Sequence, residues 1–416
     1  MPVYVWDEPG ADVVLHDGDI DVVGYGKGPG RVWASMNGAL TIRWEVDLPR
    51  SLALSEVTLR LLRPDIGTVD VPATVNHSAG RGWIAGAEPT SNRALTHIVT
   101  HWVNLPEILP AELLRNEHRS WHGRWVGEGA GWSMTLDSRP DLSQVLSAAK
   151  DSTKLVPTYT GDLRPTDGSP FAPAAAADVL YGWQVALSFA LGRWVAPAFP
   201  VGFDADGRRV WEQWGPWRCD ATSGYRSWWD SRNGRDLEDF VRLFLQAWSD
   251  PDRRDLIWHL AHHVIASNHG STTLEARIML VQATLEYLSW VKYVVPGHRS
   301  RSAHKKMGAA GRLKELLTSA NIPADIPTDF GALDQYAAQE GLPDGPAVTT
   351  FLRNRLVHPK DAGEPYQIQG LIFEAWELSM HYAELLLLHE LDYRGDYVPR
   401  FPEDRWAYDR EPVPWL

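Results

Sequence analysis

The hydrophobic pattern of this chain changes its period near residue 236. Before that point, short alternating or β-branched runs are separated by Gly, Pro, Asn and Asp, and in the run 39–48 apolar Ile42, Trp44 and Val46 alternate with polar residues. A period of two predicts half-buried strands in an antiparallel sandwich or barrel. After residue 236 the apolar residues recur at helical spacing. We therefore expect an α+β protein, in which a β-rich N-terminal region precedes an all-α helical bundle.

We place the division between the two regions at 235/236. Residues 1–235 are then a β-rich sensor or regulatory region, and residues 236–416 are a helical domain. Prolines and glycines between 157 and 173 predict a loop or linker there, with a possible further boundary. An apolar run predicts a helix over 174–192, and the turn sequence at 204–207 predicts a hairpin.

Two helices of the C-terminal region have recognisable start signals. Asp250 followed by Pro251 is typical of an N-cap with proline at the first helical position. Thr272 and Glu275 have the spacing of a capping box. Besides the helices that begin at these two points, we expect helices over 236–248, 311–319, 328–339, 346–358 and 367–391.

The charge and cysteine content exclude several classes of protein. With 40 basic and 53 acidic side chains, the net charge is −13, which excludes a uniformly basic nucleic-acid binder but allows a local basic patch. The single cysteine, Cys219, excludes an intramolecular disulfide framework and a cysteine-based zinc cluster. No apolar run approaches the roughly 18 residues that span a bilayer, and no secretory signal is visible. We therefore expect a cytoplasmic protein without membrane contact.

The most specific pattern in the chain is Arg353-Asn354-x-x-x-His358. On a helix, Leu352 and Leu356 form a core stripe, whereas Asn354 and His358 lie on the opposite side, and the long side chain of Arg353 can reach towards them. The proline after His358 predicts that the helix ends there. The alternative interpretation is a solvated helix end with a cation near its C-terminus.

This pattern resembles the R-x4–6-H motif of the HEPN (higher eukaryotes and prokaryotes nucleotide-binding) superfamily. Its place late in an all-α bundle, before a long amphipathic helix, fits that family. The segment Ala283-Thr284-Leu285-Glu286 is similar to the acidic position on the family's preceding helix. The subgroup that the chain resembles is the ApeA-type HEPN proteins of bacterial defence. The resemblance covers about 236–395, and over 1–235 it is one of architecture alone.

The resemblance implies a metal-independent endoribonuclease that acts in anti-phage defence, abortive infection or stress. It also implies a homodimer or a higher even oligomer, since the family's site forms across a dimer, and no cofactor or metal. His358 would act as general acid and base, and Arg353 would bind the scissile phosphate. Asn354 would orient His358 or the phosphate, and Glu286 would hold Arg353 or His358. For Glu286, a surface or helix-pairing carboxylate is the alternative.

A basic run provides a second signal. From residue 287 to 314 there are seven lysines and arginines and no acidic residue. We expect RNA contacts from Arg301, Lys305 and Lys306 in this run, and from Arg355 beside the motif. A mobile, solvated loop is the alternative for this segment.

Two further clusters and two other functions remain open. His259 and His263 share a helix face as metal ligands can, but no third ligand is evident, which favours ordinary core or surface histidines. A tryptophan cluster could serve base stacking or protein recognition, but core filling and domain packing are the favoured interpretation; its members are Trp211, Trp214, Trp217, Trp228 and Trp229. The other functions are a non-catalytic HEPN module for dimerisation or nucleotide binding, and a sensor whose tryptophan-rich β region binds a phage or cellular trigger.

Overall fold

The computed structural model describes residues 1–416 except 1, 5, 7, 49–51, 53, 54, 77–79, 153, 223, 224, 362 and 402–408. The chain divides into two compact units. The first comprises Met1–Gln184, Trp194–Ser223 and Ser231–Glu238, and the second comprises Val185–Arg193, Gly224–Asp230 and Asp239–Leu416. The domain boundary at 235/236 stays a prediction, and the two short segments of the second unit were not part of it.

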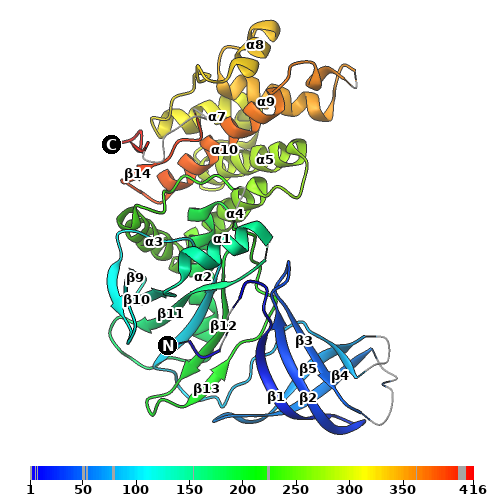
Figure 1. Ribbon diagram of the computed structural model, residues 1–416. Helices are drawn as coiled ribbons and strands as arrows, with labels where there is room; N and C mark the ends of the chain where they lie inside the picture. Colours follow the sequence, from blue (N-terminus) through cyan, green and yellow to red (C-terminus); the bar gives the residue numbers. More distant parts are fainter. Residues whose placement is uncertain are drawn as a thin grey trace. The chain divides into compact units, whose positions relative to one another are not determined.

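The first unit begins with a closed antiparallel barrel, drawn in blue in Figure 1. Its strand order is β1-β2-β3-β6-β5-β4, and β1 pairs with β4 to close it. Its strands are β1 (Val13–Val22), β2 (Gly26–Ser35), β3 (Thr41–Val46), β4 (Glu56–Arg63), β5 (Gly67–Val75) and β6 (Arg81–Ile84). In β3, Ile42, Trp44 and Val46 are buried and Arg43 is exposed, which confirms the predicted half-buried strand.

Glycine in β2 allows the barrel to close tightly. A Cβ atom at Gly28 would overlap the backbone oxygen of Asp47, and one at Gly30 would overlap that of Glu45. A larger residue would have to displace the neighbouring backbone at these two positions, which favours glycine there although both lie within a strand.

An antiparallel seven-stranded sheet follows, in the order β13-β12-β7-β11-β10-β9-β8. Its strands are β7 (His97–Val103), β8 (Glu112–Arg115), β9 (Ser120–Gly129), β10 (Trp132–Ser138), β11 (Pro157–Pro165), β12 (Ala196–Phe203) and β13 (Arg209–Glu212). The short helix α1 (Leu142–Ser152) lies against β11, and Val145 and Ala149 pack on Val156. This sheet and the barrel together confirm the β-rich N-terminal region.

The prediction of a loop or linker over 157–173 is wrong for residues 157–165. Residues 157–165 form β11, which is paired with β7 on one side and with β10 on the other. The two prolines that suggested a loop, Pro157 and Pro165, occupy the first and last positions of the strand. A proline at a strand end removes no hydrogen bond from the interior of the ladder, so the strand tolerates both.

The predicted hairpin and the predicted helix over 174–192 are confirmed. Asp204 holds the turn between β12 and β13, because its Oδ1 accepts hydrogen bonds from the backbone of Asp206 and Arg208, each at 3.0 Å. The helix is α2 (Pro173–Leu191). Against our expectation, its length and composition would suffice to cross a membrane, but 61% of its apolar window is buried inside the protein. Such burial is typical of a core helix in a soluble protein.

A buried ion pair joins the barrel to the sheet within the first unit. The Nη2 of Arg63 on β4 donates to Glu212 on β13 at 2.8 Å, and both side chains are almost fully buried. Trp214 and Tyr4 also donate to Glu212, at 3.0 and 3.3 Å, so the carboxylate is well supplied with donors. Barrel residues share one apolar core with Phe199 and other residues of the sheet.

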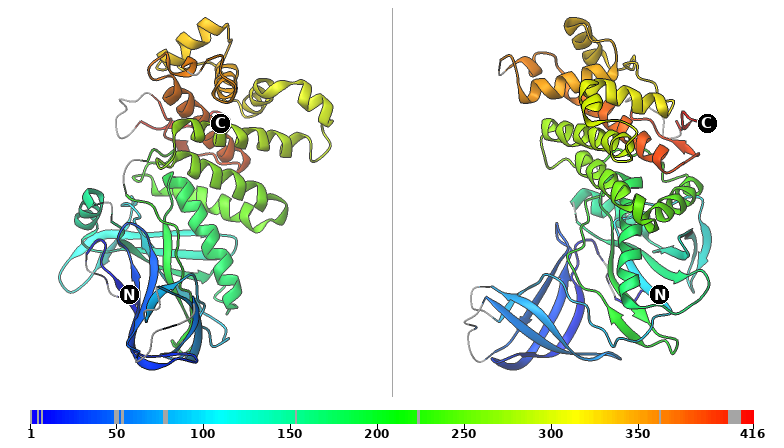
Figure 2. Two further views of the ribbon diagram at one scale, coloured as in Figure 1. Left: turned by 90° about the vertical axis from the view of Figure 1, so that its right-hand side faces the viewer. Right: turned by 180° about the vertical axis from the view of Figure 1, so that it is seen from behind.

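The second unit is built mainly from helices, as predicted. Its main helices are α3 (Gly234–Ser249, from Asp239 onward), α4 (Pro251–Asn268), α5 (Leu274–Tyr293), α6 (Arg301–Lys306), α7 (Gly308–Ser319), α8 (Gly331–Glu340), α9 (Gly345–Val357) and α10 (Leu371–Glu390). A 3-10 turn (Glu364–Tyr366) precedes α10, and the short strands β14 (Asp396–Tyr397) and β15 (Glu411–Pro412) pair near the C-terminus. Helices α4, α5 and α10 pack on one another, and α9 packs on α5, α7 and α10 (Figure 2).

One of the two predicted caps is confirmed and the other is displaced by one residue. Asp250 caps α4, and its side chain accepts from the backbone of Asp252 at 3.0 Å. Helix α5 is capped by Thr273, not Thr272, through a 3.4 Å bond from the backbone of Ala276. Glu275 therefore closes no capping box, and its carboxylate accepts from the Tyr366 hydroxyl instead.

Candidate functional site

Helix α9 positions the Arg-Asn-His pattern. Asp344 caps its start by accepting from the backbone of Ala347 at 2.9 Å, and Pro346 lies in its first turn. The helix ends where predicted: His358 is the C-cap, with φ −132° and ψ 66°, and its backbone N–H donates to the Asn354 carbonyl at 2.8 Å.

The side chains of Asn354 and His358 are exposed, as the helical spacing predicts. Leu352, on the other face of α9, is fully buried, whereas Leu356 is only half-buried. Within the part of the chain that the structure describes, the Asn354 amide and the His358 imidazole make no side-chain hydrogen bond. Both groups are therefore accessible to a ligand.

Arg353 points a different way from its neighbours on α9. Its Nη2 donates to Oε1 of Glu286 on α5, and the Arg353 side chain is 24% exposed. The contact between Glu286 and Arg353 considered in the sequence analysis is thus present. The Arg353 side chain therefore reaches towards α5 rather than towards His358, and the alternative of a fully solvated helix end does not describe Arg353.

A third residue, Arg312 on α7, joins this pair and was not singled out from the sequence. Its Nη2 donates to Oε2 of Glu286 at 3.2 Å, and its Nη1 donates to the backbone oxygen of His304 at 3.2 Å. One carboxylate therefore bridges three helices. Burial lowers the pKa of the Arg353 and Arg312 guanidinium groups, because the charged form loses water. The buried Nε atoms of both arginines have no partner among the described residues.

The basic run consists of paired and unpaired cations. Four of the seven are paired with carboxylates, namely Lys292 with Glu390, Arg299 with Glu315, Arg312 with Glu286 and Lys314 with Asp344. The remaining three are Arg301, Lys305 and Lys306, the residues predicted to bind RNA, and all three are exposed on α6. Among described residues none of these three has an ionic partner, and Arg301 lies 5.8 Å from the centre of the Trp290 ring.

The same segment is helical rather than a loop at these positions. Ser300 caps α6 by accepting from the backbone of Ala303 at 3.3 Å. Arg355, the fourth predicted RNA contact, lies elsewhere and is already paired: its Nε is 3.3 Å from Glu364, and its guanidinium lies 4.8 Å from the Phe351 ring centre. The structure thus groups three of the four predicted basic residues and separates Arg355 from them.

The histidine pair on α4 packs against aromatic and hydroxyl groups of α5. The rings of His259 and His263 are 4.0 Å apart, His259 stacks on Tyr287 at 4.1 Å, and His263 Nδ1 lies 3.0 Å from the Thr284 hydroxyl. Burial lowers the pKa of both imidazoles, which favours their neutral form. Among described residues, no group of three or more His, Cys, Asp or Glu side chains is placed to hold a metal ion.

The tryptophan cluster serves the core of each unit. Trp211 and Trp214 are buried in the first unit, and Trp228 and Trp229 are buried in the second. Trp217 is half-buried and packs on the core of the first unit. Buried rings cannot stack on a nucleic-acid base, so core packing is the interpretation that the structure favours for these residues.

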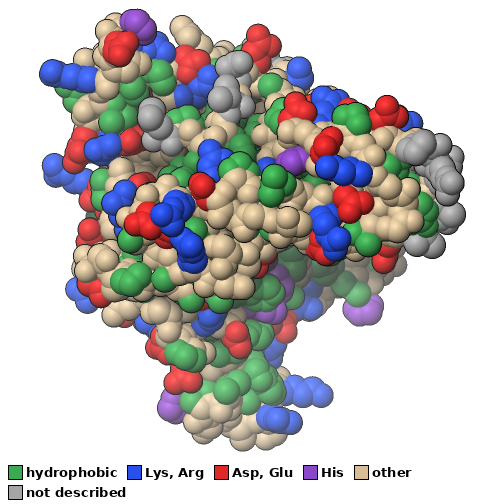
Figure 3. Space-filling view, turned by 90° about the horizontal axis from the view of Figure 1, so that it is seen from below, with side chains coloured by type: hydrophobic (Ala, Val, Ile, Leu, Met, Phe, Trp, Pro, Cys, Tyr) green, Lys and Arg blue, Asp and Glu red, His purple; other side chains and the backbone are tan. Residues whose placement is uncertain are grey.

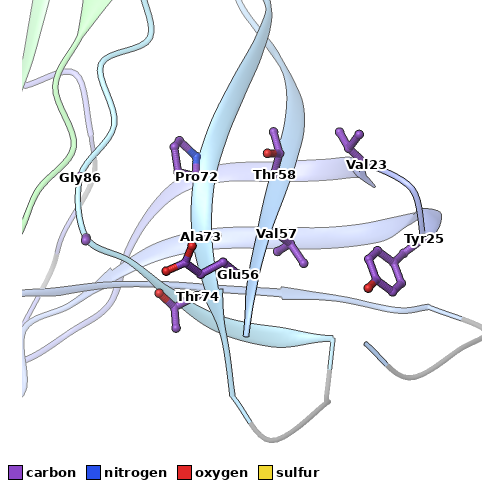
Figure 4. A pocket seen from close by; sticks show the side chains of 10 residues that line it. Val23, Tyr25, Glu56, Val57, Thr58, Pro72, Ala73, Thr74 and Gly86 are labelled. Carbon is purple, nitrogen blue, oxygen red and sulfur yellow. The ribbon is translucent and has the colours of Figure 1, made fainter. Parts of the chain in front are cut away.

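A pocket of about 490 Å³ lies beside β4 and β5 of the barrel (Figure 4). Val23 and Tyr25 come from the turn between β1 and β2, and Thr58 and Thr74 come from the two strands. Among the ten described residues that line it, Glu56 alone is charged. This pocket holds no set of residues for acid–base or nucleophilic chemistry.

Comparison with known proteins links both units to one kind of protein. Residues 90–225 match the family described as the YopA central domain, and residues 250–411 match the family described as the YopA C-terminal domain. The chain is also similar to the SPbeta prophage-derived uncharacterized protein YopA of Bacillus subtilis (strain 168). The two are 27% identical over 307 residues, which cover 71% of this chain and 68% of the relative. No solved structure matches this chain.

The candidate site lies within the second of these matches, since Glu286, Arg312, Arg353 and His358 all fall between 250 and 411. The descriptions of both families and of the relative name no activity. These matches do not test the HEPN resemblance, which stays an expectation based on Glu286 of α5 and on Arg353, Asn354 and His358 of α9.

Proposed function

We propose that this protein is a metal-independent endoribonuclease of the HEPN type, which cleaves RNA by attack of a ribose 2′-hydroxyl on the adjacent phosphate. The observation that carries the proposal is the arrangement around α9. Glu286 anchors Arg353 and Arg312, and the same helix ends at the exposed imidazole of His358. A cation and a titratable base on one helix are the two groups that this reaction needs most.

Each residue of the proposed site has a separate role in RNA cleavage. His358 removes the proton from the 2′-hydroxyl, since imidazole is the side chain whose ordinary pKa is closest to neutrality. Arg353 donates hydrogen bonds to the phosphate oxygens and stabilises the charge that grows on them. Arg312 supplies a second positive charge beside the first. Asn354 lies one turn before His358, on the same face of the helix, and its amide orients the phosphate or the imidazole.

RNA is held beside the site by α6. Arg301, Lys305 and Lys306 are exposed and carry no ionic partner among the described residues, so their charges are available to phosphates. Exposed lysine and arginine side chains release counterions from RNA when they bind it, which provides affinity without sequence selectivity. A local group of this kind suffices for binding although the whole chain carries a net charge of −13.

The active form is a homodimer or a higher even oligomer. Cleavage needs both a base for the 2′-hydroxyl and an acid for the leaving 5′-oxygen, and one protomer offers one His358. A two-fold axis beside α9 brings a second His358 to the site. The proposed setting is cytoplasmic defence against phage or a stress response, with a phage or cellular trigger sensed by the β-rich unit. The prophage origin stated in the relative's name fits such a conflict between phage and host.

The test is RNA cleavage by purified full-length variants. His358→Ala and Arg353→Ala should each lower the cleavage rate at least about a hundredfold, the contribution usual for a positioned acid–base group. Products should end in a 2′,3′-cyclic phosphate or its hydrolysis product, and EDTA should leave the rate unchanged. His118→Ala and Arg394→Ala change exposed residues of the same types and serve as controls. Wild-type rates in both α9 variants would refute the proposed mechanism.

One observation favours a second function, a non-catalytic HEPN module. Arg353 is already bound to Glu286, and a phosphate must compete with that carboxylate for the guanidinium. In a module that only dimerises, the same contact simply fastens α9 to α5. Loss of self-association in α9 variants, together with the absence of cleavage by the wild type, would identify this function.

A further inference from the structure

A larger cavity, of about 690 Å³, lies in the first unit and is separate from every residue discussed above for RNA cleavage. Its lining comes from four places: the N-terminal segment, the β8–β9 hairpin, the end of β10 with the residues that follow it, and the start of β11. The volume is within the range of roughly 300–1,000 Å³ that is usual for small-molecule sites. It is far too small for a helix or a duplex.

Three of the lining residues, Arg124, Asp137 and Thr160, belong to a row of residues that lie opposite one another on neighbouring strands; the row continues to the fully buried His101, which is not part of the lining. Arg124 on β9 is opposite Asp137 on β10, which is opposite Thr160 on β11, which is opposite His101 on β7. Residues directly opposite in an antiparallel sheet share one face. The first two form a double contact, with Nε to Oδ1 and Nη2 to Oδ2 both at 2.7 Å.

Two described residues near the N-terminus, Val3 and Trp6, contact His101 at the end of this row. The backbone N–H of Val3 donates to Nε2 of His101 at 3.2 Å, and the Trp6 ring meets the His101 ring edge-on at 4.8 Å. His101 therefore carries its proton on Nδ1, which donates to the Ala198 carbonyl at 3.3 Å. This anchoring makes Trp6 and Tyr4 a fixed part of the cavity's lining.

Three of the aromatic side chains that line the cavity, Trp121, Tyr159 and Tyr4, have their polar atoms already in hydrogen bonds. The indole N–H of Trp121 donates to the carbonyl and hydroxyl of Ser138, at 3.1 and 3.2 Å. The Tyr159 hydroxyl accepts from the backbone of Ile108 at 3.2 Å, and the Tyr4 hydroxyl donates to Glu212. What these rings offer to a ligand is consequently their faces and edges, which suits stacking on a flat aromatic group.

The charge of the lining is positive in a chain that is acidic overall. Four arginines and two aspartates line the cavity, which leaves an excess of two positive charges. Asp137 pairs with Arg124, and Asp141 pairs with Arg139 at 2.6 Å. Arg115 and Arg119 are exposed and have no carboxylate within ion-pair distance among the described residues. Unpaired guanidinium groups beside aromatic rings match a ligand that is both flat and anionic.

We propose that this cavity binds a nucleotide, with the base stacked on Trp121 or Trp6 and the phosphate held by Arg115 and Arg119. An uncharged aliphatic ligand leaves the two guanidinium groups without an anionic acceptor, and an aliphatic or inorganic anion leaves the aromatic lining without a stacking partner. A free nucleotide and the end of a single RNA strand present the same chemistry. The inference goes beyond the proposed ribonuclease activity, because it concerns other residues in the other unit.

Binding is measured by titrating the full-length protein with each of the four nucleoside 5′-monophosphates, using tryptophan fluorescence and calorimetry. We expect saturable binding of at least one of them. The double variant Arg115→Ala/Arg119→Ala should weaken it by about ten- to a hundredfold, as expected when hydrogen bonds to a charged group are removed. Arg43→Ala, an exposed arginine on the barrel, should bind like the wild type. Circular dichroism checks that the double variant is folded, which its exposed positions favour.

Further experiments distinguish a free nucleotide from an RNA end, and some of their outcomes would refute the nucleotide site. A 5′-phosphorylated RNA hexamer, tested in the His358→Ala background so that it stays intact, should compete with the monophosphate if the cavity takes a strand end. Failure to compete identifies a free nucleotide. Equal affinity for inorganic phosphate, no saturable binding at millimolar concentration, or unchanged affinity in the double variant would each refute the site. RNA cleavage is a separate readout, so the two proposals fail independently.

Discussion

The carboxylate of Glu286 on α5 connects this helix to α7 and α9. Each of its carboxylate oxygens accepts from a different arginine, Arg353 on α9 and Arg312 on α7, so the group is both a structural joint and a support for the proposed phosphate site. The motif on α9 predicts Arg353 and His358 as site residues, and the segment 283–286 predicts Glu286; their part in catalysis stays a prediction. Arg312 could not be predicted as a partner of Glu286, because this contact depends on the packing of α7 against α5, which no local sequence pattern indicates.

We predict that Glu286→Gln lowers the free energy of unfolding by about 1 kcal/mol, as expected for a partly exposed pair. An amide carries no charge to hold two guanidinium groups, so Arg353 loses its fixed position. A misplaced catalytic group typically costs about tenfold or more in rate. Urea unfolding and RNA cleavage measure the two effects, with the exposed Glu117→Gln as control. Wild-type cleavage by Glu286→Gln, while Arg353→Ala is inactive, would show that Glu286 does not position Arg353.

His101 gives the first unit a pH dependence. Complete burial in β7 lowers its pKa to about 4, because the charged imidazole is deprived of water. The unfolded chain, with an ordinary pKa of about 6.5, takes up the proton first as the pH falls. Stability is therefore present above pH 6.5 and is lost as the pH drops towards 4, by up to about 3 kcal/mol for this group.

The measurement is the urea unfolding free energy at several pH values between about 4 and 6.5. In His101→Gln the slope against pH should be shallower than in the wild type, by up to about 1.4 kcal/mol per pH unit in the middle of this range. The exposed His118→Gln should leave the slope unchanged. Parallel curves for the wild type and His101→Gln would contradict the burial argument.

Helices and strands are predicted correctly where a local sequence pattern determines them, and incorrectly where pairing with distant strands determines them. The alternation in β3 and the N-cap at Asp250 are local signals, and both are confirmed. The prolines of the segment that forms β11 favour a loop on local grounds, but the residues between Pro157 and Pro165 pair with β7 and β10, and no local pattern indicates that pairing. For the five clustered tryptophans, core packing is the interpretation that the sequence favours, and the burial of four of them agrees with it.

Helix α6 is the element on which the proposed RNA affinity depends. If Arg301, Lys305 and Lys306 bind phosphates, changing all three to Ala should make the dependence of log K on log salt shallower by up to about 2, since each phosphate that a cation neutralises on single-stranded RNA adds about 0.7 to the slope. The control changes Lys292, Arg299 and Lys314, which are already paired with carboxylates and should alter the slope little. Binding is measured with His358→Ala protein and a labelled RNA. Equal slopes for the triple variant and its parent would show that α6 does not bind phosphates and is an ordinary solvated helix.

At the scale of the whole molecule, the acidic net charge is not gathered on one surface in the view from below. On the described surface drawn in Figure 3, basic and acidic side chains are interspersed. The two units were foreseen as a β-rich and a helical part, because the change of hydrophobic period is visible in the sequence. The sequence does not predict that the short segments 185–193 and 224–230 belong with the helical unit, since along the chain each lies between segments of the first unit.

The proposed dimer can be tested by subunit mixing, because one protomer supplies one His358 to a reaction that needs both an acid and a base. If two protomers complete the site, mixing equal amounts of wild type and His358→Ala after subunit exchange should leave about one quarter of the activity per total protein, the share of dimers with two intact histidines. Independent sites would leave about one half. Mixing the wild type with His118→Ala should leave the activity unchanged. Full activity in a protein that sedimentation shows to be monomeric at the assay concentration would refute the composite site while leaving the role of His358 itself intact.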